Sequence, residues 1–389
     1  GDRVVTSSIE GGYGLFAGRL PRVYFGNAFS RTNVDSDYVY NIGQFGPSAG
    51  PIPNLSTGAV TGITDPRFFW TRSSQSDYVY GQNGYRLYAF THFTDPNFEG
   101  PSTYKSNIAL NLQFANGYDV RFEYNKDSVN KALLWKDLSY SEEGTLADGR
   151  ALLDQRDNPY LTNTGEGGGE AFSIIATKAF DNGVNLYAGY TNMEMEDASR
   201  VASAQADSAY NKQPHDLAGE NLRAAPSDFM VDDKLIIGLD YTTQIFGTND
   251  TRFSVLANRK SGRRYSLVYE TGDSEASITD GNWEAYDLIY VPTGVNDPNV
   301  VFASDAVASS VMNFLNSGCA AGFSGQIMTR NACKGDYATR VDLRITQDFQ
   351  VNDDQKIVIY FDIQNLINFL DDDKGWQTEI DTNSVSRAV

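Results

Sequence analysis

The sequence predicts an all-β protein, an antiparallel transmembrane β-barrel with short periplasmic turns and long extracellular loops. Three observations favour this fold class. Apolar and polar residues alternate over segments of about ten residues or more, the length that spans a bilayer at the usual tilt. Short polar turns follow a Phe at several segment ends, and they alternate with very long connections. A soluble β-sandwich would also alternate, but its strands are commonly about five or six residues long.

The composition of the 389 residues suits strands and turns, because it includes 23 Tyr, 22 Phe and 35 Gly. No run approaches about 18 apolar residues, which excludes a transmembrane helix. The first residues, "GDRVVTSSIEGGYGLF", lack the pattern of a signal peptide. The formal charge of −19 argues against a nucleic-acid partner, whose phosphates require a basic surface.

We interpret residues 1–389 as a single domain in which nine segments alternate clearly. In a barrel, the apolar residues of each strand face lipid and the polar residues face a wet lumen. The residues expected to face lipid include Ile108, Leu110, Leu112, Val341, Leu343 and Ile345. The predicted strands are 3–15, 101–114, 119–136, 170–180, 184–194, 233–246, 251–268, 337–349 and 355–368, and a tenth is left open at 376–388.

Four Phe residues precede short polar turns between alternating segments. Phe180, for example, is followed by Asp181-Asn182-Gly183, a strong hairpin signal because Gly adopts a positive φ without steric cost. An aromatic residue at this position is typical of the girdle at a membrane interface. We therefore predict a periplasmic aromatic girdle of Phe114, Phe180, Phe246 and Phe349.

The long connections are expected to be extracellular loops at about 16–100, 139–169, 196–232 and 270–336. Segments 148–155 and 304–317 within them are candidates for short helices. The two cysteines of the chain, Cys319 and Cys333, lie in the last of these loops. They suit one local disulfide in an oxidising compartment, with two free buried thiols as the alternative.

Several blocks along the chain carry a family resemblance: "GGYGLFAGRLPRVYFGNAFSRTNV" (11–34), the block at 95–138 that begins "DPNFEGP", "NRKSGRRYSLVY" (258–269), "YDLIYVPTGVNDPNVVF" (286–302), "RNACKGDYATRVDLRITQDF" (330–349) and "IYFDIQNLIN" (359–368). In this order they resemble the Oar-like TonB-dependent receptors of Gram-negative outer membranes. The resemblance implies a barrel of about 22 strands around a plug that carries a TonB box. No plug or TonB box is recognisable in this chain, which we expect to be a C-terminal part of such a barrel.

The resemblance implies a receptor for TonB-dependent ligand uptake, located in the outer membrane of a Gram-negative bacterium. The alternative is a structural or scaffold barrel that anchors partner proteins without transport. We do not expect an enzyme, because only two histidines, His92 and His215, are present and no metal or nucleophile motif is filled. The expected partners are outer-membrane lipid or lipopolysaccharide, TonB through the absent plug, and other outer-membrane proteins.

Two groups of residues are candidates for ligand contact. Polar strand residues should face the lumen, where they either solvate it and bind a plug or touch the ligand; they are Lys105, Asn107, Arg121, Glu123, Asp240, Arg340, Asp342 and Arg344. Loop aromatics can stack on sugar or peptide, with packing inside the loop as the alternative. These aromatics are Phe68, Phe69, Trp70, Tyr78 and Tyr80.

We predict no cofactor and no dedicated metal site. Three acidic groups carry the hard oxygen ligands that suit a loop-bound Ca²⁺, although none has the EF-hand spacing. The alternative for each is solvated loop charge. The three groups are Asp371-Asp372-Asp373, then Asp95 with Asn97 and Glu99, and Asn296 with Asp297 and Asn299.

Overall fold

The computed structural model describes most of the strands and part of the loops. The described residues are 3–20, 22–30, 53–54, 59–60, 92–137, 141–147, 149–154, 159–199, 203, 205–211, 214–215, 223–269, 279–280 and 286–375. The candidate tenth strand at 376–388 and the aromatics Phe68, Phe69, Trp70, Tyr78 and Tyr80 lie outside them. None of the helices in these ranges is long and apolar enough to cross a membrane.

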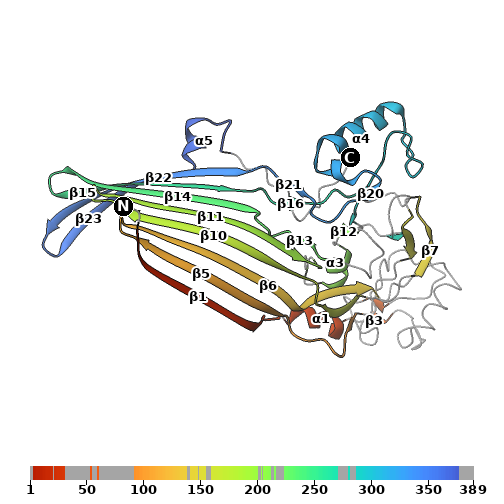
Figure 1. The fold of residues 1–389 in the computed structure, drawn as a ribbon. Helices are drawn as coiled ribbons and strands as arrows, with labels where there is room; N and C mark the ends of the chain where they lie inside the picture. Colours follow the sequence, from red (N-terminus) through yellow and green to blue (C-terminus); the bar gives the residue numbers. More distant parts are fainter. Residues whose placement is uncertain are drawn as a thin grey trace.

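The protein is all-β, and its main feature is one curved antiparallel sheet (Figure 1). Nine long strands pair in the order in which they occur in the sequence, so that each packs beside its chain neighbour. In sheet order they are β1 (Val4–Ala17), β5 (Ser102–Phe114), β6 (Tyr118–Asp137), β10 (Gly167–Ala179), β11 (Val184–Asp197), β14 (Asp233–Phe246), β15 (Asn249–Lys260), β22 (Ala338–Asn352) and β23 (Gln355–Ile363).

The shorter elements belong to the connections between these strands. The strands are β2 (Pro53–Asn54), β3 (Ala59–Val60), β4 (Phe93–Thr94), β7 (Ser141–Thr145), β8 (Ala151–Asp154), β9 (Pro159–Thr164), β12 (Pro214–His215), β13 (Ala225–Pro226), β16 (Arg264–Tyr265), β17 (Thr279–Asp280), β18 (Tyr286–Asp287), β19 (Tyr290–Val291), β20 (Gln326–Ile327) and β21 (Cys333–Lys334). The helices are α1 (Val23–Ser30), α3 (Ala206–Asn211), α4 (Asp305–Ser317), the 3₁₀ helix η3 (Cys319–Phe323) and α5 (Leu366–Leu370).

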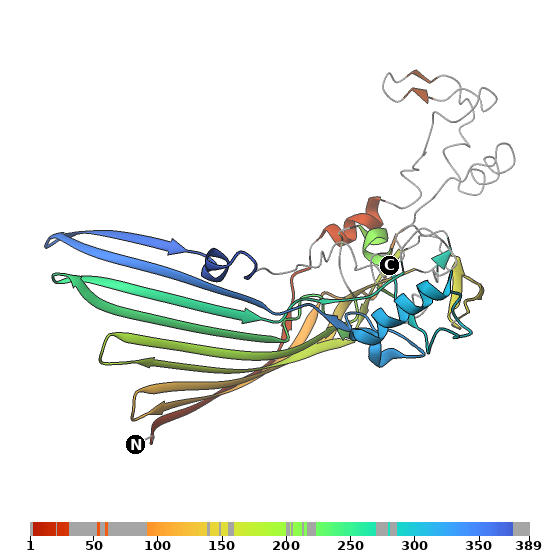
Figure 2. The same cartoon turned by 90° about the horizontal axis from the view of Figure 1, so that it is seen from above.

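Four tight turns join strands into hairpins at one end of the sheet, and the long connections leave from the other end (Figure 2). The hairpins are β5–β6, β10–β11, β14–β15 and β22–β23. Gly117 and Gly183 turn with φ of 82° and 85°, a conformation that a side chain would strain. The four predicted turns and their shared end are therefore confirmed.

The strand register divides the sheet into two faces with different chemistry. Directly paired residues share a face, so Leu110, Phe122, Ile174, Tyr190 and Leu235 form one continuous row across five strands. We call this side the apolar face. The residues next to these on each strand point the other way, and the row of Asn111 and Arg121 marks the polar face.

Nothing in the described part of the chain packs over the apolar face as a second sheet would. Ile108 is 55% exposed, Ile237 40% and Ile359 58%. The buried hydrophobic clusters among the described residues contain no residue of this face. A continuous exposed apolar surface that extends across the strands of a sheet marks a contact with another apolar phase or partner.

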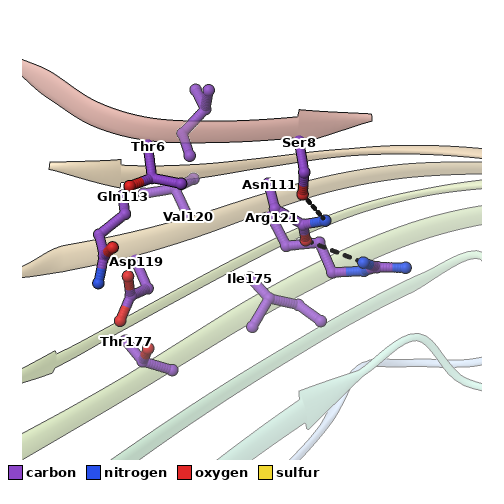
Figure 3. A pocket seen from close by; sticks show the side chains of 10 residues that line it. Thr6, Ser8, Asn111, Gln113, Asp119, Val120, Arg121, Ile175 and Thr177 are labelled. Carbon is purple, nitrogen blue, oxygen red and sulfur yellow. Dashed lines mark hydrogen bonds between the residues drawn. The ribbon is translucent and has the colours of Figure 1, made fainter. Parts of the chain in front are cut away.

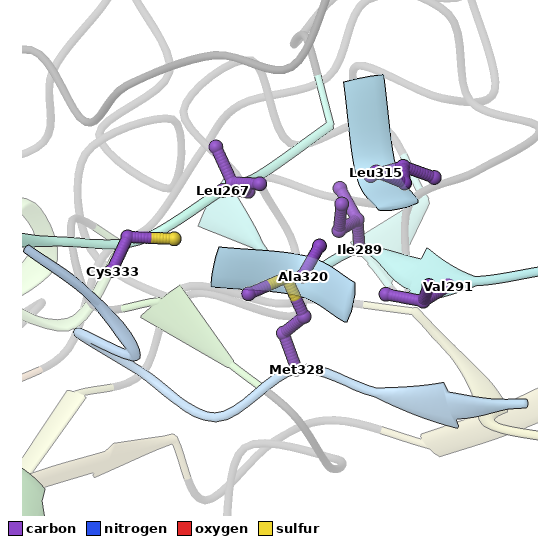
Figure 4. Packing of buried hydrophobic residues seen from close by; sticks show 7 residues of the cluster. All are labelled: Leu267, Ile289, Val291, Leu315, Ala320, Met328 and Cys333. Carbon is purple, nitrogen blue, oxygen red and sulfur yellow. The ribbon is translucent and has the colours of Figure 1, made fainter. Parts of the chain in front are cut away.

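The buried cores lie in the connections. The larger one, shown in Figure 4, contains Leu267, Ile289, Val291, Leu315, Ala320, Met328 and Cys333. We call the described residues between 264 and 336 the loop body. The predicted disulfide is confirmed, because Cys319 and Cys333 are bonded and tie η3 to β21. A second core forms around Trp135 and Leu161 where β6, β9 and α3 meet.

Three sequence predictions about element type or length need correction. Segment 148–155 is not a helix: β8 pairs with β7 there. The strand predicted at 251–268 ends at Lys260, because Leu267 and Val268 are buried in the loop region. The strand predicted at 355–368 ends at Ile363, and α5 follows it. The helix at 304–317 is confirmed as α4, with the Ser304 hydroxyl accepting the Val307 amide as its N-cap.

Candidate functional site

All eight polar residues predicted to face a lumen lie on the polar face. The strand register shows which face these residues occupy. Asn111 pairs directly with Arg121. Asp240 pairs with Ser254, which in turn pairs with Arg344. The even spacing along each strand then places the remaining ones on the same side. The eight are Lys105, Asn107, Arg121, Glu123, Asp240, Arg340, Asp342 and Arg344.

Ion pairs between neighbouring positions cover much of the polar face. Lys105 Nζ lies 2.8 Å from Asp127 Oδ2 across the β5–β6 pair. At the other side of the sheet, the Arg344 guanidinium donates to both carboxylate oxygens of Asp362, at 2.6 and 2.7 Å. The pairs are solvated, so each adds little to stability. Their effect is to fix charged groups in place along a wet surface.

Arg121 is the centre of the densest group on this face. Its guanidinium lies 3.1 Å from Glu10 Oε2 on β1 and 2.9 Å from Glu123 Oε2 on its own strand. The Asn111 side-chain oxygen accepts a third bond at 2.9 Å, and the Asn111 amide donates to Ser8 Oγ at 3.1 Å. Sequence reasoning missed Glu10, which is the only charged residue of the stretch Val4–Gly14.

A shallow depression of about 270 Å³ lies beside this group (Figure 3). Hydroxyl, amide and charged side chains enter it from four strands, and Ile175 adds an apolar patch. Such a lining offers donors and acceptors of both signs, which suits the binding of a polar molecule. Its lining residues are Thr6, Ser8, Asn111, Leu112, Gln113, Asp119, Val120, Arg121, Ile175 and Thr177.

The four predicted girdle residues lie on the apolar face at or near the turn ends of their strands. Phe114 pairs with Val4 and continues the row of Leu110 and Leu112. The Phe180 ring meets the Tyr118 ring edge-on at 6.5 Å, and Phe246 lies 6.3 Å from Phe349. A band of aromatic side chains therefore lines the turn end of this face. Its position in a membrane stays a prediction.

A second aromatic band, which sequence reasoning missed, lines the loop end of the apolar face. Tyr13 and Tyr104 stack with centroids 6.0 Å apart. Further along, the Tyr124 hydroxyl donates to Glu170 at 2.5 Å, and the Tyr190 hydroxyl donates to Asp233 at 2.6 Å. The rings of Tyr124 and Tyr190 lie on the apolar side while their hydroxyls reach carboxylates, the arrangement that favours Tyr at interfaces. The sequence signal that could have identified these tyrosines is that each lies an even number of residues from the apolar residues of its strand, as Tyr13 does from Ile9.

Between these two aromatic bands, the described positions of the apolar face are uncharged except for Lys178. Its ammonium lies 4.2 Å from the Tyr118 ring centroid and 4.5 Å from the Phe180 ring centroid, beside the turn-end band. The other intervening positions are occupied by aliphatic, aromatic, Gly, Ser or Thr residues and by Gln347. The aliphatic and aromatic residues at these positions on the central strands include Ile174, Ala176, Leu186, Ala188, Leu235, Ile237, Leu239, Tyr241, Phe253, Val255, Ala257, Val341, Leu343 and Ile345.

The loop body is fastened to the rim of the sheet by charged and polar contacts. Arg330 is bonded to the backbone and side chain of Asp197 at the end of β11. Arg264 donates to both oxygens of Asp232, at 2.9 and 3.1 Å, and Lys334 lies 3.0 Å from the same carboxylate. This last bond raises the pKa of the Lys334 ammonium. These contacts hold the loop body against the rim of the sheet.

Two of the three candidate Ca²⁺ groups use their carboxylates within the loops. Asp297 accepts from the Thr293 and Asn299 amides at 2.7 and 2.9 Å, and these bonds lower its pKa to about 2. Asp95 accepts from the Thr162 hydroxyl and the Asn97 amide, which lower its pKa. Both carboxylates act as turn acceptors here.

The third candidate group lies after α5. One ligand atom from each of its three carboxylates lies within 4.8 Å of the others, and two of the three residues are exposed. This proximity alone does not separate a cation site from solvated loop charge. The prediction for Asp371, Asp372 and Asp373 therefore stays open.

No family model matches the sequence, and no curated protein matches it. Among solved structures, the ferric preacinetobactin receptor BauA from Acinetobacter baumannii is similar to this chain, with a TM-score of 0.34 and 11% identity. The similarity covers 70% of this chain and 26% of that receptor, so the chain spans about a quarter of its length. The resemblance to Oar-like receptors stays a prediction.

Proposed function

We propose that the chain forms part of the barrel of an outer-membrane receptor, which binds a polar ligand with its loops and passes it through the lumen. The observation that carries the proposal is the contrast between the faces of one sheet. In the described strands the apolar face carries no charge between its aromatic bands other than Lys178, whose ammonium lies against the turn-end rings, while the polar face carries ion pairs. This contrast is expected for a barrel wall whose outer face contacts the hydrocarbon of a bilayer and whose inner face contacts water.

The height of the apolar face agrees with a bilayer. On β14 the apolar positions run from Leu235 to Ile245. These ten steps extend roughly 33 Å at about 3.3 Å per residue. A strand tilted by about 40° would rise about 25 Å along the membrane normal, which is the height of the apolar band in outer-membrane barrels.

The polar face and the loop body supply the parts that a receptor needs. The Arg121 group and its depression would contact the ligand or a plug, and the loop body would form the outer entrance. Binding and translocation require no covalent step, so we propose no catalytic residue and no cofactor. Membership of the Oar-like family would make the uptake TonB-dependent.

The test uses the full-length protein in its own cells. After separation of the membranes on a density gradient, we expect the protein in the outer-membrane fraction. A photo-cross-linker on the periplasmic side should trap TonB, and depletion of the proton-motive force should abolish uptake of the ligand that co-purifies with the receptor. Recovery in the soluble fraction would contradict the proposal.

The scaffold alternative has its own signature in the same experiment. A protein that fractionates with the outer membrane, never cross-links to TonB and retains partner proteins at fixed stoichiometry would be a structural subunit. That result would keep the barrel and remove the transport function.

A further inference from the structure

A cation at the loop end of the apolar face has no anionic partner among the described residues. Arg259 is the last residue of this face on β15, where it pairs across the sheet with Leu235 and Thr339. Its guanidinium is exposed and, among the described residues, makes no ion pair or hydrogen bond. It lies 4.8 Å from the centroid of the Tyr337 ring. All five N–H donors of this group are thus available to a ligand.

The carboxylate of Asp233, two residues along the chain from the Leu235 partner of Arg259, is held by other donors. Asp233 accepts from the Tyr190 and Tyr337 hydroxyls at 2.6 and 2.9 Å and from the Asn192 amide at 3.1 Å. Three donors hold this carboxylate in place, which explains why it does not pair with Arg259. The arrangement keeps the arginine unpaired without leaving a buried group unsatisfied.

A second cation approaches the same aromatic ring. Lys334 Nζ lies 5.6 Å from the Tyr337 centroid and 3.0 Å from Asp232 Oδ2. Asp232 takes one of its three ammonium protons and is itself paired with Arg264, which leaves the other protons of Lys334 free. The adjacent Cys333 is tied by the disulfide, so the position of Lys334 is fixed.

We propose that Arg259, Lys334 and Tyr337 bind the phosphate group of a phosphorylated lipid in the outer leaflet. This inference rests on the proposed function, because only a membrane-spanning sheet brings this face to the lipid headgroups. Two cations on one aromatic platform at the edge of an apolar surface match an anionic headgroup whose acyl chains lie along Leu235 and Ile237. Guanidinium and phosphate form charge-assisted, bidentate hydrogen bonds.

The test measures retention of diphosphoryl lipid A by the full-length protein in mixed micelles, with dephosphorylated lipid A and inorganic phosphate as separate probes. We expect Arg259→Ala to weaken binding of the diphosphoryl lipid by about tenfold or more, the effect of one charged hydrogen bond. Arg259→Lys should restore part of the affinity. The matched control is Arg252→Ala, on the same strand but on the polar face, which should leave lipid binding unchanged.

Each outcome decides a separate point. Equal binding by wild type and Arg259→Ala, in protein that still inserts into bilayers, would overturn the inference and leave the receptor proposal intact. If inorganic phosphate binds as tightly as diphosphoryl lipid A, the site recognises phosphate in general, and the inference that its ligand is a lipid would be wrong. Failure of the wild type to insert into bilayers would instead overturn the receptor proposal.

Discussion

The rings of Phe246 and Phe349 lie side by side, with centroids 6.3 Å apart, although they belong to different hairpins. Simple alternation from Leu239 and Tyr241 would put Phe246 on the polar face. The register of β14 and β15 shifts between Thr243 and Phe246, and this bulge turns the ring to the apolar side. The contact therefore ties two hairpins together at the turn end of the apolar face.

The Phe246–Phe349 contact should appear as a coupling energy. Replacing each Phe by Ala, singly and together, should give a coupling of about 0.5–1.5 kcal/mol in the free energy of unfolding, as for other aromatic pairs. The measurement is reversible unfolding of the full-length protein in lipid vesicles. Phe114→Ala, on a distant hairpin, should be additive with Phe349→Ala. Additivity of the Phe246 and Phe349 substitutions would contradict the pairing.

An arginine should destabilise the protein much more at one of two adjacent positions of β15 than at the other. Val255 lies on the apolar face, and Leu256 lies on the polar face with 47% of its surface exposed. In bilayers, Val255→Arg should lower the free energy of unfolding by about 2–4 kcal/mol, the cost of an arginine near the midplane. Leu256→Arg should cost less than about 1 kcal/mol because its side chain stays in water. Equal costs would show that both faces meet the same medium.

The disulfide should stabilise the loop body without affecting the sheet. Its two cysteines are separated by 14 positions, and closing a loop of this size contributes about 3 kcal/mol. We expect the Cys319→Ser/Cys333→Ser variant to be cleaved faster by protease within 264–336, while strand content by circular dichroism stays the same. The wild type should show no free thiol when denatured without reductant, and a count of two would refute the bond.

Acid should loosen the turn around Asp297. Its pKa is lowered to about 2 in the fold, below the ordinary value of 3.8. The contribution of this carboxylate to stability is therefore complete above about pH 4 and is lost as the pH falls through 2. Hydrogen exchange of the Thr293 and Asn299 amides should accelerate over this range. Asp297→Asn should exchange faster at neutral pH and lose this pH dependence; an unchanged profile would contradict the assignment.

The sequence predicts the sheet well because alternation and turns are local signals. Residues 233–246, for example, are a strand with the predicted bounds, and Gly183 turns where Asn-Gly indicated. The same kind of signal fails in the loops. Leu267 and Val268 were included in the predicted strand 251–268 but are buried in the loop cores, which the local pattern cannot reveal.

The site was only partly predictable for a related reason. Alternation along the strands places Lys105 and Arg121 on the correct face. Their ion-pair partners, however, depend on which strands pair and in which register. Glu10 meets Arg121 across an intervening strand, and Arg330 reaches Asp197 from a distant loop. The unpaired state of Arg259 depends on three donors that occupy Asp233. Such long-range contacts leave no mark in one sequence.

The central claim is that one face of the sheet meets lipid and the other meets water. The most direct measurement is the accessibility of a spin label placed in turn at each position from Leu235 to Tyr241 in reconstituted bilayers, the native cysteines being bonded to each other. We predict that Leu235, Ile237, Leu239 and Tyr241 favour oxygen dissolved in lipid, while Ile236, Gly238 and Asp240 favour a water-soluble nickel complex. Equal accessibility to the nickel complex at all seven positions would contradict the account.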